Sequence, residues 1–327
     1  MSDDPFIDKL KNYGSRFVAD DGFHVPKTLD YFWTETCWFA LVIPDRKITI
    51  QLYPFFQPNL GVCSAGVYIW DNTGDQWWNC LYYKNFWHLP FPQQPLTDIS
   101  LPNGLRYRTI ESLHKYEIGF DCPDGEDVHL NVTWEAVVPP NIASSKTHMD
   151  QPGRITGTLV LHGERIEVDG LGFRDRTWSV RTQFGQGVGP FDSMGYTWGT
   201  SRSSDDGFFL LSGNADEDFA EYRLLDGILF RDGDVAKLKQ ATRTILERHP
   251  GDGHPLRTAI DLVDVAGRTA HIEGTNVNSF CANLYPNLLV WECQTRWSMD
   301  SLELFGEDED NWGVHPFRRF IRKLQGK

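Results

Sequence analysis

The sequence predicts an all-β protein with two domains, each a barrel or sandwich of antiparallel strands. Three observations lead to this fold class. Apolar and polar residues alternate over short segments along most of the chain, and glycine, proline, aspartate or asparagine bounds each segment. The length of 327 residues is large for one compact domain. Aromatic residues make up 13% of the chain, so part of this aromatic surface could line a cavity instead of filling a core.

The first half is predicted to begin with a helix and to continue as hairpins. Residues 5–17 have helical spacing, and Asp3 or Asp4 is available as the N-terminal cap. After this segment the strand period dominates, and the turn at 71–75, Asp-Asn-Thr-Gly-Asp, is typical of a hairpin. The predicted strands of this half are 39–43, 47–52, 62–70, 76–83, 107–113, 115–120 and 127–135.

A connector separates the two halves. Residues 139–153 are polar, proline-rich and aperiodic, which predicts an N-terminal domain of residues 1–145 and a C-terminal domain of residues 146–327. The second half repeats the strand pattern at 155–161, 164–168, 194–201, 207–213, 221–230, 235–247, 256–263, 269–275 and 288–298. Residues 235–247 could form a helix by composition, but their alternation favours a strand. The last segment, 316–324, is predicted to be helical.

Charge and targeting signals exclude several classes of partner. The net charge of −14 argues against binding to the phosphate backbone of nucleic acid and against adsorption to anionic membranes. No run of about 18 apolar residues is present, so we expect no membrane span. The N-terminus, Met1-Ser2-Asp3-Asp4, is acidic and lacks the apolar stretch of a secretory signal. We therefore expect a soluble cytoplasmic protein.

The cysteines and histidines do not show the spacing of a metal site. The 6 cysteines are scattered and form no CxxC pair, and the histidines form neither HxxxH nor HxH. These patterns predict no metal site, and in a cytoplasmic protein we expect the thiols to be reduced.

The densest polar cluster of the sequence is the segment 170–181, Gly-Leu-Gly-Phe-Arg-Asp-Arg-Thr-Trp-Ser-Val-Arg. It follows a strand-like run, so we expect it at a strand end. Because unpaired buried charges are costly, these side chains must pair with one another. In a strand, Arg174 and Arg176 face one way and Asp175 the other, so that Asp175 either points inward beside Trp178 or pairs with Arg181. The cluster is thus either a structural clamp or the polar spot of an apolar pocket.

Four segments resemble the hydroxyneurosporene synthase-like superfamily, which includes carotenoid 1,2-hydratases, related fungal hydratases and lipocalin-like pericyclases. They are Trp33–Phe39 (WTETCWF), Tyr53–Gly61 (YPFFQPNLG), Gln151–Arg181 with its Arg-Asp-Arg-Thr-Trp-Ser-Val-Arg ending, and Trp291–Trp297 (WECQTRW). The resemblance covers most of the chain and implies two lipocalin-like domains. One departure is Thr177-Trp178-Ser179, where relatives commonly carry Ser-Trp-Gly.

The resemblance gives the acidic and aromatic residues of these motifs a chemistry. Hydration or cyclisation of an alkene begins with a proton delivered to carbon, which needs a carboxylic acid kept protonated by an apolar wall and an aromatic face for the cation. Asp175 and Trp178 supply both parts, unless Asp175 is an ionised partner of the neighbouring arginines. Glu292 lies in an aromatic strand, where it is either functional or faces solvent and pairs with Arg296. The candidate catalytic residues are Asp175, Glu292 and Tyr196.

The candidate substrate-binding residues carry aromatic rings or cationic heads. They are Trp38, His88, Arg176, Trp178, Arg181 and Trp198. The resemblance implies a cofactor-independent enzyme that hydrates, isomerises or cyclises a hydrophobic isoprenoid, steroid-like or polyketide-like molecule in an aromatic cleft between two barrels. Two alternatives stay open: a non-catalytic carrier of an apolar molecule, and a pericyclase. A homodimer is one possible assembly.

Overall fold

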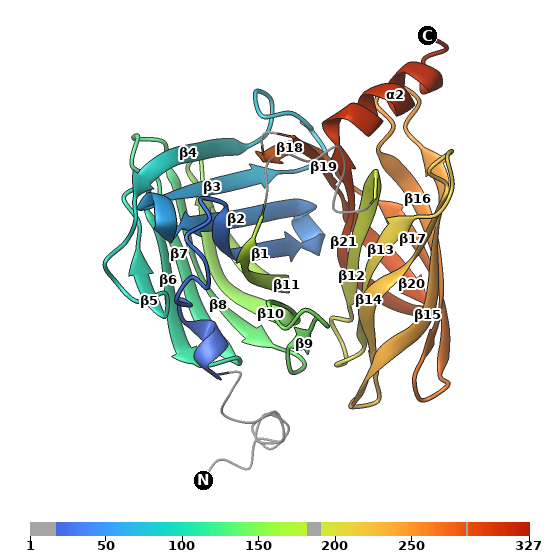
Figure 1. The fold of residues 1–327 in the computed structure, drawn as a ribbon, viewed down its shortest axis with the longest axis horizontal. Helices are drawn as coiled ribbons and strands as arrows, with labels where there is room; N and C mark the ends of the chain where they lie inside the picture. The colour runs from blue at the N-terminus through green and yellow to red at the C-terminus, as the bar shows by residue number, and fades with distance from the viewer. Residues whose placement is uncertain (1–17, 182–190, 286) are drawn as a thin grey trace. The chain divides into compact units, whose positions relative to one another are not determined.

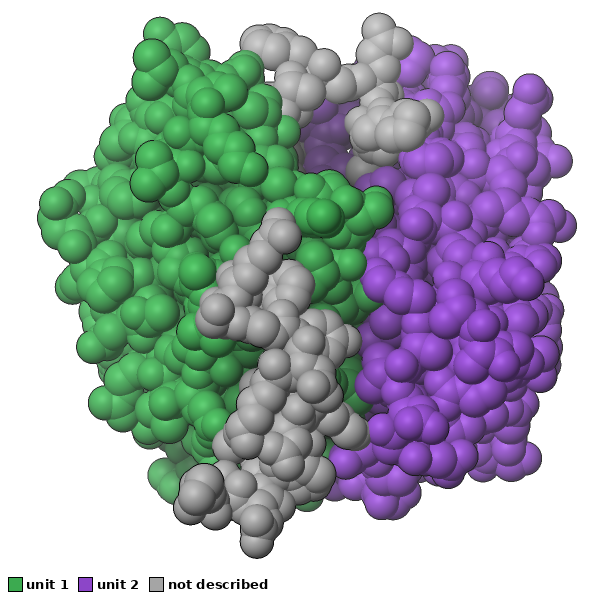
Figure 2. Space-filling model, turned by 60° about the horizontal axis from the view of Figure 1, so that its bottom comes forward, with its two compact units in different colours: residues 1–43, 50–68, 82–181 green, residues 44–49, 69–81, 182–327 purple. Residues whose placement is uncertain are grey.

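The computed structural model describes residues 18–181, 191–285 and 287–327. The chain forms two compact units (Figure 2). Unit 1 comprises Met1–Ile43, Ile50–Tyr68 and Tyr82–Arg181, and unit 2 comprises Pro44–Thr49, Ile69–Leu81 and Thr182–Lys327. Each unit is built on antiparallel strands, so the predicted all-β class is confirmed. Within the described ranges, no helix has both the length and the apolar character needed to cross a membrane.

Unit 1 is built on a strongly curved sheet (Figure 1). Its strand order is β4-β3-β2-β1-β11-β10-β8-β7-β6-β5, and β9 pairs with β10. The strands are β1 (Trp33–Ile43), β2 (Ile48–Gln57), β3 (Val62–Trp70), β4 (Tyr82–Pro90), β5 (Asp98–Ser100), β6 (Leu105–Glu111), β7 (Lys115–Asp121), β8 (Val128–Ala136), β9 (Asn141–Ile142), β10 (His148–Leu161) and β11 (Glu164–Val180). Short 3-10 helices are η1 (Val18–Asp21), η2 (Pro44–Arg46) and η3 (Pro58–Leu60).

The core of unit 1 lies on one face of this sheet and is largely aromatic. Trp134 of β8 packs against Phe39 and Tyr116, with ring centroids 6.2 and 5.5 Å away. Gly153 of β10 and Gly172 of β11 leave room for this indole, because a Cβ atom there would lie 2.3 and 2.7 Å from its ring. The cavity that remains in this interior has a volume of only about 10 Å³. Side chains therefore fill this part of unit 1.

The strands β10 and β11 place the domain boundary later than the sequence predicted. β11 pairs with β10 on one side and with β1 on the other, from Trp33 opposite Val180 to Val42 opposite Leu171. Residues 146–181 consequently complete the sheet of unit 1, and the units divide after Arg181. The segment 170–180 lies within a long strand, because pairing on both sides keeps its backbone extended.

Unit 2 contains a closed barrel of eight strands, because β12 pairs with both β13 and β21 (Figure 1). The sheet order is β12-β13-β14-β15-β16-β17-β20-β21-β19-β18. The elements are β12 (Ser193–Thr200), β13 (Gly207–Asn214), β14 (Glu221–Arg231), β15 (Asp234–Arg248), β16 (Pro255–Asp264), β17 (Thr269–Asn276), β18 (Phe280–Tyr285), β19 (Leu288–Glu292), β20 (Gln294–Met299), β21 (Leu302–Gly313) and the helix α2 (Val314–Leu324). One apolar cluster, which includes Phe208, Ile260 and Trp297, fills the barrel.

Most predicted elements are confirmed, including the strand at 235–247 and the C-terminal helix. The helix expected at 5–17 lies outside the described residues. The predicted strand 76–83 is wrong over its first half, because the backbone N–H groups of Asn79 and Cys80 both donate to the carbonyl of Gln76 and close a turn. The predicted strand 288–298 is interrupted at Cys293, whose carbonyl accepts a hydrogen bond from the backbone of Asp308.

Candidate functional site

Arg174 is buried inside unit 1 as part of a clamp. Its Nη2 lies 2.5 Å from Oδ1 of Asp21, and its Nη1 donates to the hydroxyl of Tyr116 at 2.9 Å. Both members of this ion pair are almost wholly inaccessible to solvent. Burial opposes the charge of Arg174, but Tyr107, Tyr116 and Asp21 hold its pKa well above the ordinary range. This arginine therefore ties η1 to the sheet.

Arg176 and Trp178 lie on the same face and belong to a second buried network. Arg176 donates to the carbonyl of Gly22 at 2.8 Å and pairs with Glu35 at 3.2 Å. Its guanidinium carbon lies 5.8 Å from the Trp178 ring centroid. His24 stacks on the indole of Trp178 with ring centroids 4.3 Å apart. For both arginines and for Trp178, the structural-clamp interpretation describes the geometry.

Asp175 projects from the opposite face of β11, because side chains alternate along a strand. Its Oδ1 accepts hydrogen bonds from Thr36 at 3.3 Å and Thr177 at 3.4 Å. Trp38 is directly opposite Asp175 in the register of β1 and β11, so these two predicted residues share a face. Trp178 does not, and the predicted pairing of Asp175 with that indole is therefore wrong.

A half-buried histidine accompanies Asp175, and we call His148, Asp150 and Asp175 the His148 group. His148 Nε2 lies 2.8 Å from Asp150, and its Nδ1 lies 2.7 Å from Thr177 Oγ1 and 3.8 Å from Asp175. Burial opposes the charge of His148, but Asp150 and Asp175 raise its pKa to about 9. His148 is therefore a cation at neutral pH, and it holds the proton of this group.

Arg181 adds a second cation to this part of unit 1. It donates to Thr177 Oγ1 at 3.0 Å and to the hydroxyl of Tyr53 at 3.3 Å. His88, by contrast, lies exposed at a positive φ of 58° on β4. Its described contacts are with Ser64 and Trp87. His88 therefore does not join Asp175, Trp38 and Arg181, although all four residues belong to unit 1.

In unit 2, three buried glutamates converge on the face of β21 that points away from the barrel interior, and we call them the glutamate cluster. Glu292 ends β19, and Glu307 and Glu309 lie on β21. One carboxylate oxygen from each of the three lies within 4.8 Å of the others. Asp308 and Asp310 alternate with them and point into the barrel, where Arg243 and Arg248 pair with them at 2.7 and 2.6 Å.

Glu307 lies in an environment that disfavours the charge of its carboxylate. The indole of Trp198 donates to its Oε2 at 3.2 Å, and its buried Oε1 has no hydrogen-bond partner among the described residues. Burial, and then the charge of Glu292, raise the pKa of Glu307 well above its ordinary value, and the bond from Trp198 offsets this only in part. Burial in this cluster therefore favours the protonated form of the Glu307 carboxyl.

Aromatic residues of β12 stand directly beside these carboxyl groups. Trp198 is opposite Glu307 and Tyr196 is opposite Glu309 in the register of β12 and β21. The Tyr196 ring packs on Phe209 with centroids 4.9 Å apart. Three predicted residues, Glu292, Tyr196 and Trp198, are thus brought together in unit 2. The arrangement is a buried carboxyl with a raised pKa beside aromatic side chains.

Four residues of these clusters were not predicted from the sequence: Glu307, Glu309, His148 and Asp150. The first two lie in the acidic run Glu307-Asp-Glu-Asp310, and its strand period could have shown that the glutamates and aspartates occupy different faces. His148 and Asp150 lie in the predicted connector, where aperiodic sequence carried no signal.

Comparisons with known proteins agree with this fold. Residues 18–306 match the family DUF7064, described as a domain of unknown function. Among curated proteins, none shows a significant sequence match. A protein from Nitrosomonas europaea described as an AttH has 14% identity and a TM-score of 0.64, with 90% of this chain and 95% of that chain covered.

Two further solved structures share the architecture. Kievitone hydratase from Nectria haematococca has 11% identity and a TM-score of 0.55, over 88% of this chain and 90% of that chain. CghA has 9% identity and a TM-score of 0.57, over 89% of this chain and 93% of that chain. These likenesses confirm the fold expected from the hydroxyneurosporene synthase-like resemblance.

Proposed function

The chain belongs to the DUF7064 family, and on that premise we propose that it is an enzyme that protonates a carbon–carbon double bond of a hydrophobic substrate. One observation carries the proposal: Glu307 is a buried carboxyl with a strongly raised pKa, beside aromatic side chains of β12. Such an acid can donate its proton to carbon at neutral pH, which an ordinary exposed glutamate cannot do. The name of kievitone hydratase, a protein of the same fold, supports hydration as one outcome.

The proposed reaction begins at Glu307. Its Oε–H transfers a proton to one alkene carbon, the π electron pair forms the new C–H bond, and the other carbon becomes cationic. The ring faces of Trp198 and Tyr196 are suited to stabilise this cation electrostatically. Water can then attack the cation, a second double bond can close a ring, or a neighbouring C–H can lose its proton.

Each outcome returns a proton to the enzyme. In hydration, the attacking water adds its oxygen to the cation and releases one proton to the Glu307 carboxylate, which restores the acid. In isomerisation and cyclisation, that carboxylate takes a proton from a carbon next to the cation. We assign Glu292 as an alternative proton acceptor, because one of its carboxylate oxygens lies within 4.8 Å of a carboxylate oxygen of Glu307.

We assign a binding role to the polar face of unit 1. His148 is cationic, and both His148 and Arg181 are hydrogen-bonded to the hydroxyl of Thr177. Two cations beside Asp175 could bind an oxygenated head group of a substrate, with Trp38 on the same face. Arg176 and Trp178 are left out of this role, because their contacts serve the clamp.

Incubation with a panel of isoprenoids, steroids and polyenes in deuterated water, read by mass spectrometry, tests the proposal. We expect carbon-bound deuterium in a product formed by the wild type and by the control Glu303→Gln, whose side chain is half exposed on the same strand. Glu307→Gln should form that product about 10² to 10⁴ times more slowly. Equal rates for Glu307→Gln and wild type would overturn the assignment, and a retained but unchanged compound would favour a carrier.

A further inference from the structure

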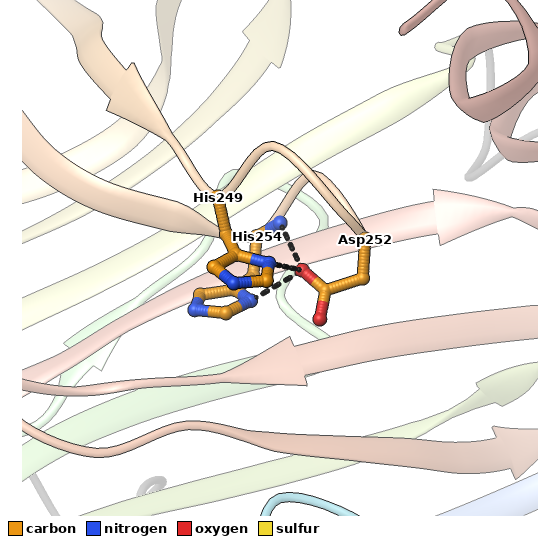
Figure 3. Close-up of side chains that lie close together, drawn as sticks. All are labelled: His249, Asp252 and His254. Atoms are coloured by element: carbon orange, nitrogen blue, oxygen red, sulfur yellow. Dashed lines mark hydrogen bonds and ion pairs between the residues drawn. The ribbon is translucent and has the colours of Figure 1, made fainter. Parts of the chain in front are cut away.

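The hairpin between β15 and β16 carries metal-ligating side chains that the proposed function does not use. The loop reads His249-Pro-Gly-Asp-Gly-His254, and its two imidazoles and one carboxylate converge (Figure 3). Nδ1 of His249 lies 2.9 Å and Nδ1 of His254 lies 2.6 Å from Oδ1 of Asp252. One ligand atom from each of the three residues lies within 4.8 Å of the others. These three atoms are close enough to chelate one ion.

Backbone contacts hold the loop in this shape. His249 N donates to the carbonyl of His254 at 2.8 Å, and Gly253 N donates to the carbonyl of His249 at 2.9 Å. Arg248 donates to the carbonyl of Gly253 at 2.8 Å. Gly253 has a φ of +80°, and a Cβ atom there would lie 2.6 Å from the Phe320 ring. The three ligands are therefore preorganised, which lowers the entropy cost of binding.

Ring packing orders the two imidazoles of this loop. The two imidazole rings stack with centroids 4.8 Å apart, and His254 also packs on Trp291 at 4.8 Å. A metal can replace both imidazole–carboxylate contacts once each ring carries its proton on Nε2, because Nδ1 then offers a lone pair.

A polar pocket adjoins this loop, and His254 forms part of its wall. The pocket has a volume of about 410 Å³. Its other lining residues are mostly carboxylates, amides and hydroxyls: Asp71, Asn72, Thr73, Asp75, Asn276 and Asn278 among them. Such a pocket admits water, which a metal with three protein ligands needs for its remaining coordination positions.

Two other groups of ligating residues are less suited to a transition metal. In the His148 group, the pKa of His148 is about 9, so the imidazole keeps its proton at neutral pH. The glutamate cluster offers oxygen atoms only. The loop at 249–254 offers two nitrogen ligands and one charged oxygen.

We propose that His249, Asp252 and His254 bind a divalent transition metal of the zinc type, with water from the adjoining pocket completing its coordination. Imidazole nitrogen suits Zn²⁺, Fe²⁺, Co²⁺ and Ni²⁺, whereas Mg²⁺ and Ca²⁺ prefer all-oxygen sets. Two histidines with one carboxylate leave at least one open position, which is the arrangement of metal sites that bind water or a ligand. The site shares no residue with the glutamate cluster.

Titration of the metal-free, untagged protein tests the proposal. The protein is treated with a chelator and titrated with Zn²⁺ by calorimetry and with Co²⁺ by visible absorption. We expect one equivalent to bind, with the intense visible bands of a low-symmetry Co²⁺ site. His254→Gln and Asp252→Asn should weaken binding at least tenfold, and His249→Ala, which changes a partly exposed residue, covers the case that the first two fail to fold.

His271→Gln is the matched control, because His271 is also hydrogen-bonded to an aspartate but has no second histidine in its group. It should bind Zn²⁺ as the wild type does. Binding that is equal in wild type and in His249→Ala, or the absence of saturable binding by the folded wild type, would overturn the proposal. Because the readout is metal affinity, the result is independent of the proposed alkene chemistry.

Discussion

The pH dependence of stability gives the sharpest physical test of Glu307. A carboxyl whose pKa is higher in the folded state than in the unfolded state makes the folded state bind more protons. The stability that this group contributes is fully present below the unfolded pKa of about 4.5, and it is lost as the pH rises towards the folded pKa. Replacement by glutamine removes this proton uptake and hence this loss.

The magnitude follows from the free energy of one proton. Each pH unit between the two pKa values costs the wild type about 1.4 kcal/mol. Over the part of the range from pH 5 to pH 7 that lies below the folded pKa, Glu307→Gln should therefore gain about 1.4 kcal/mol per pH unit relative to wild type. The amide oxygen of the glutamine can accept the hydrogen bond from the Trp198 indole. Its buried amide N–H donors, if unpaired, lower the free energy of unfolding by about 1–3 kcal/mol at every pH. That offset does not change with pH, so the slope is the informative quantity.

Urea unfolding at pH 5, 6 and 7 measures this slope for the wild type, Glu307→Gln and the control Glu303→Gln. The control changes a half-exposed member of an ion pair with Arg296, so we expect its stability to stay within about 0.5 kcal/mol of wild type. If Glu307→Gln shows the same pH dependence as wild type, Glu307 is not a protonated acid in the folded protein, and the reasoning from burial fails.

The remaining predictions concern the clamp, the His148 group and the metal loop. Arg174→Met should cost about 3–5 kcal/mol in urea unfolding, because it leaves the buried Asp21 carboxylate unpaired, and a loss below about 1 kcal/mol would contradict the clamp. Because the pKa of His148 is about 9, the stability that it contributes is fully present below about pH 6.5 and is lost as the pH rises through 9. In thermal melts between pH 6.5 and pH 9, the difference in melting temperature between wild type and His148→Gln should therefore shrink as the pH rises. Gly253→Ala should lower the melting temperature and weaken Zn²⁺ binding, because the positive φ and the Phe320 contact exclude a Cβ atom, and unchanged binding would show that the loop shape is not needed.

The local sequence determined most of the strands and the C-terminal helix, because backbone period and turn chemistry act over a few residues. Alternation along β8 and the turn residues His162-Gly163 between β10 and β11 are examples. The same period correctly separated Arg174 and Arg176 from Asp175. It could not say which face is buried, since alternation gives relative direction only.

Tertiary structure decided where the domains divide and which charges meet. β11 belongs to unit 1 because it pairs with β1, which is more than 120 residues away in the chain and leaves no local signal. The glutamate cluster forms because β19 and β21 are neighbours in the sheet of unit 2, and burial there raises the pKa of Glu307. The loop at 249–254 shows the opposite case: its ligands are close in sequence, but the positive φ of Gly253 and the contact with Phe320 determine that they converge. In each case the chemistry depends on desolvation and on distances between side chains, which a sequence pattern does not contain.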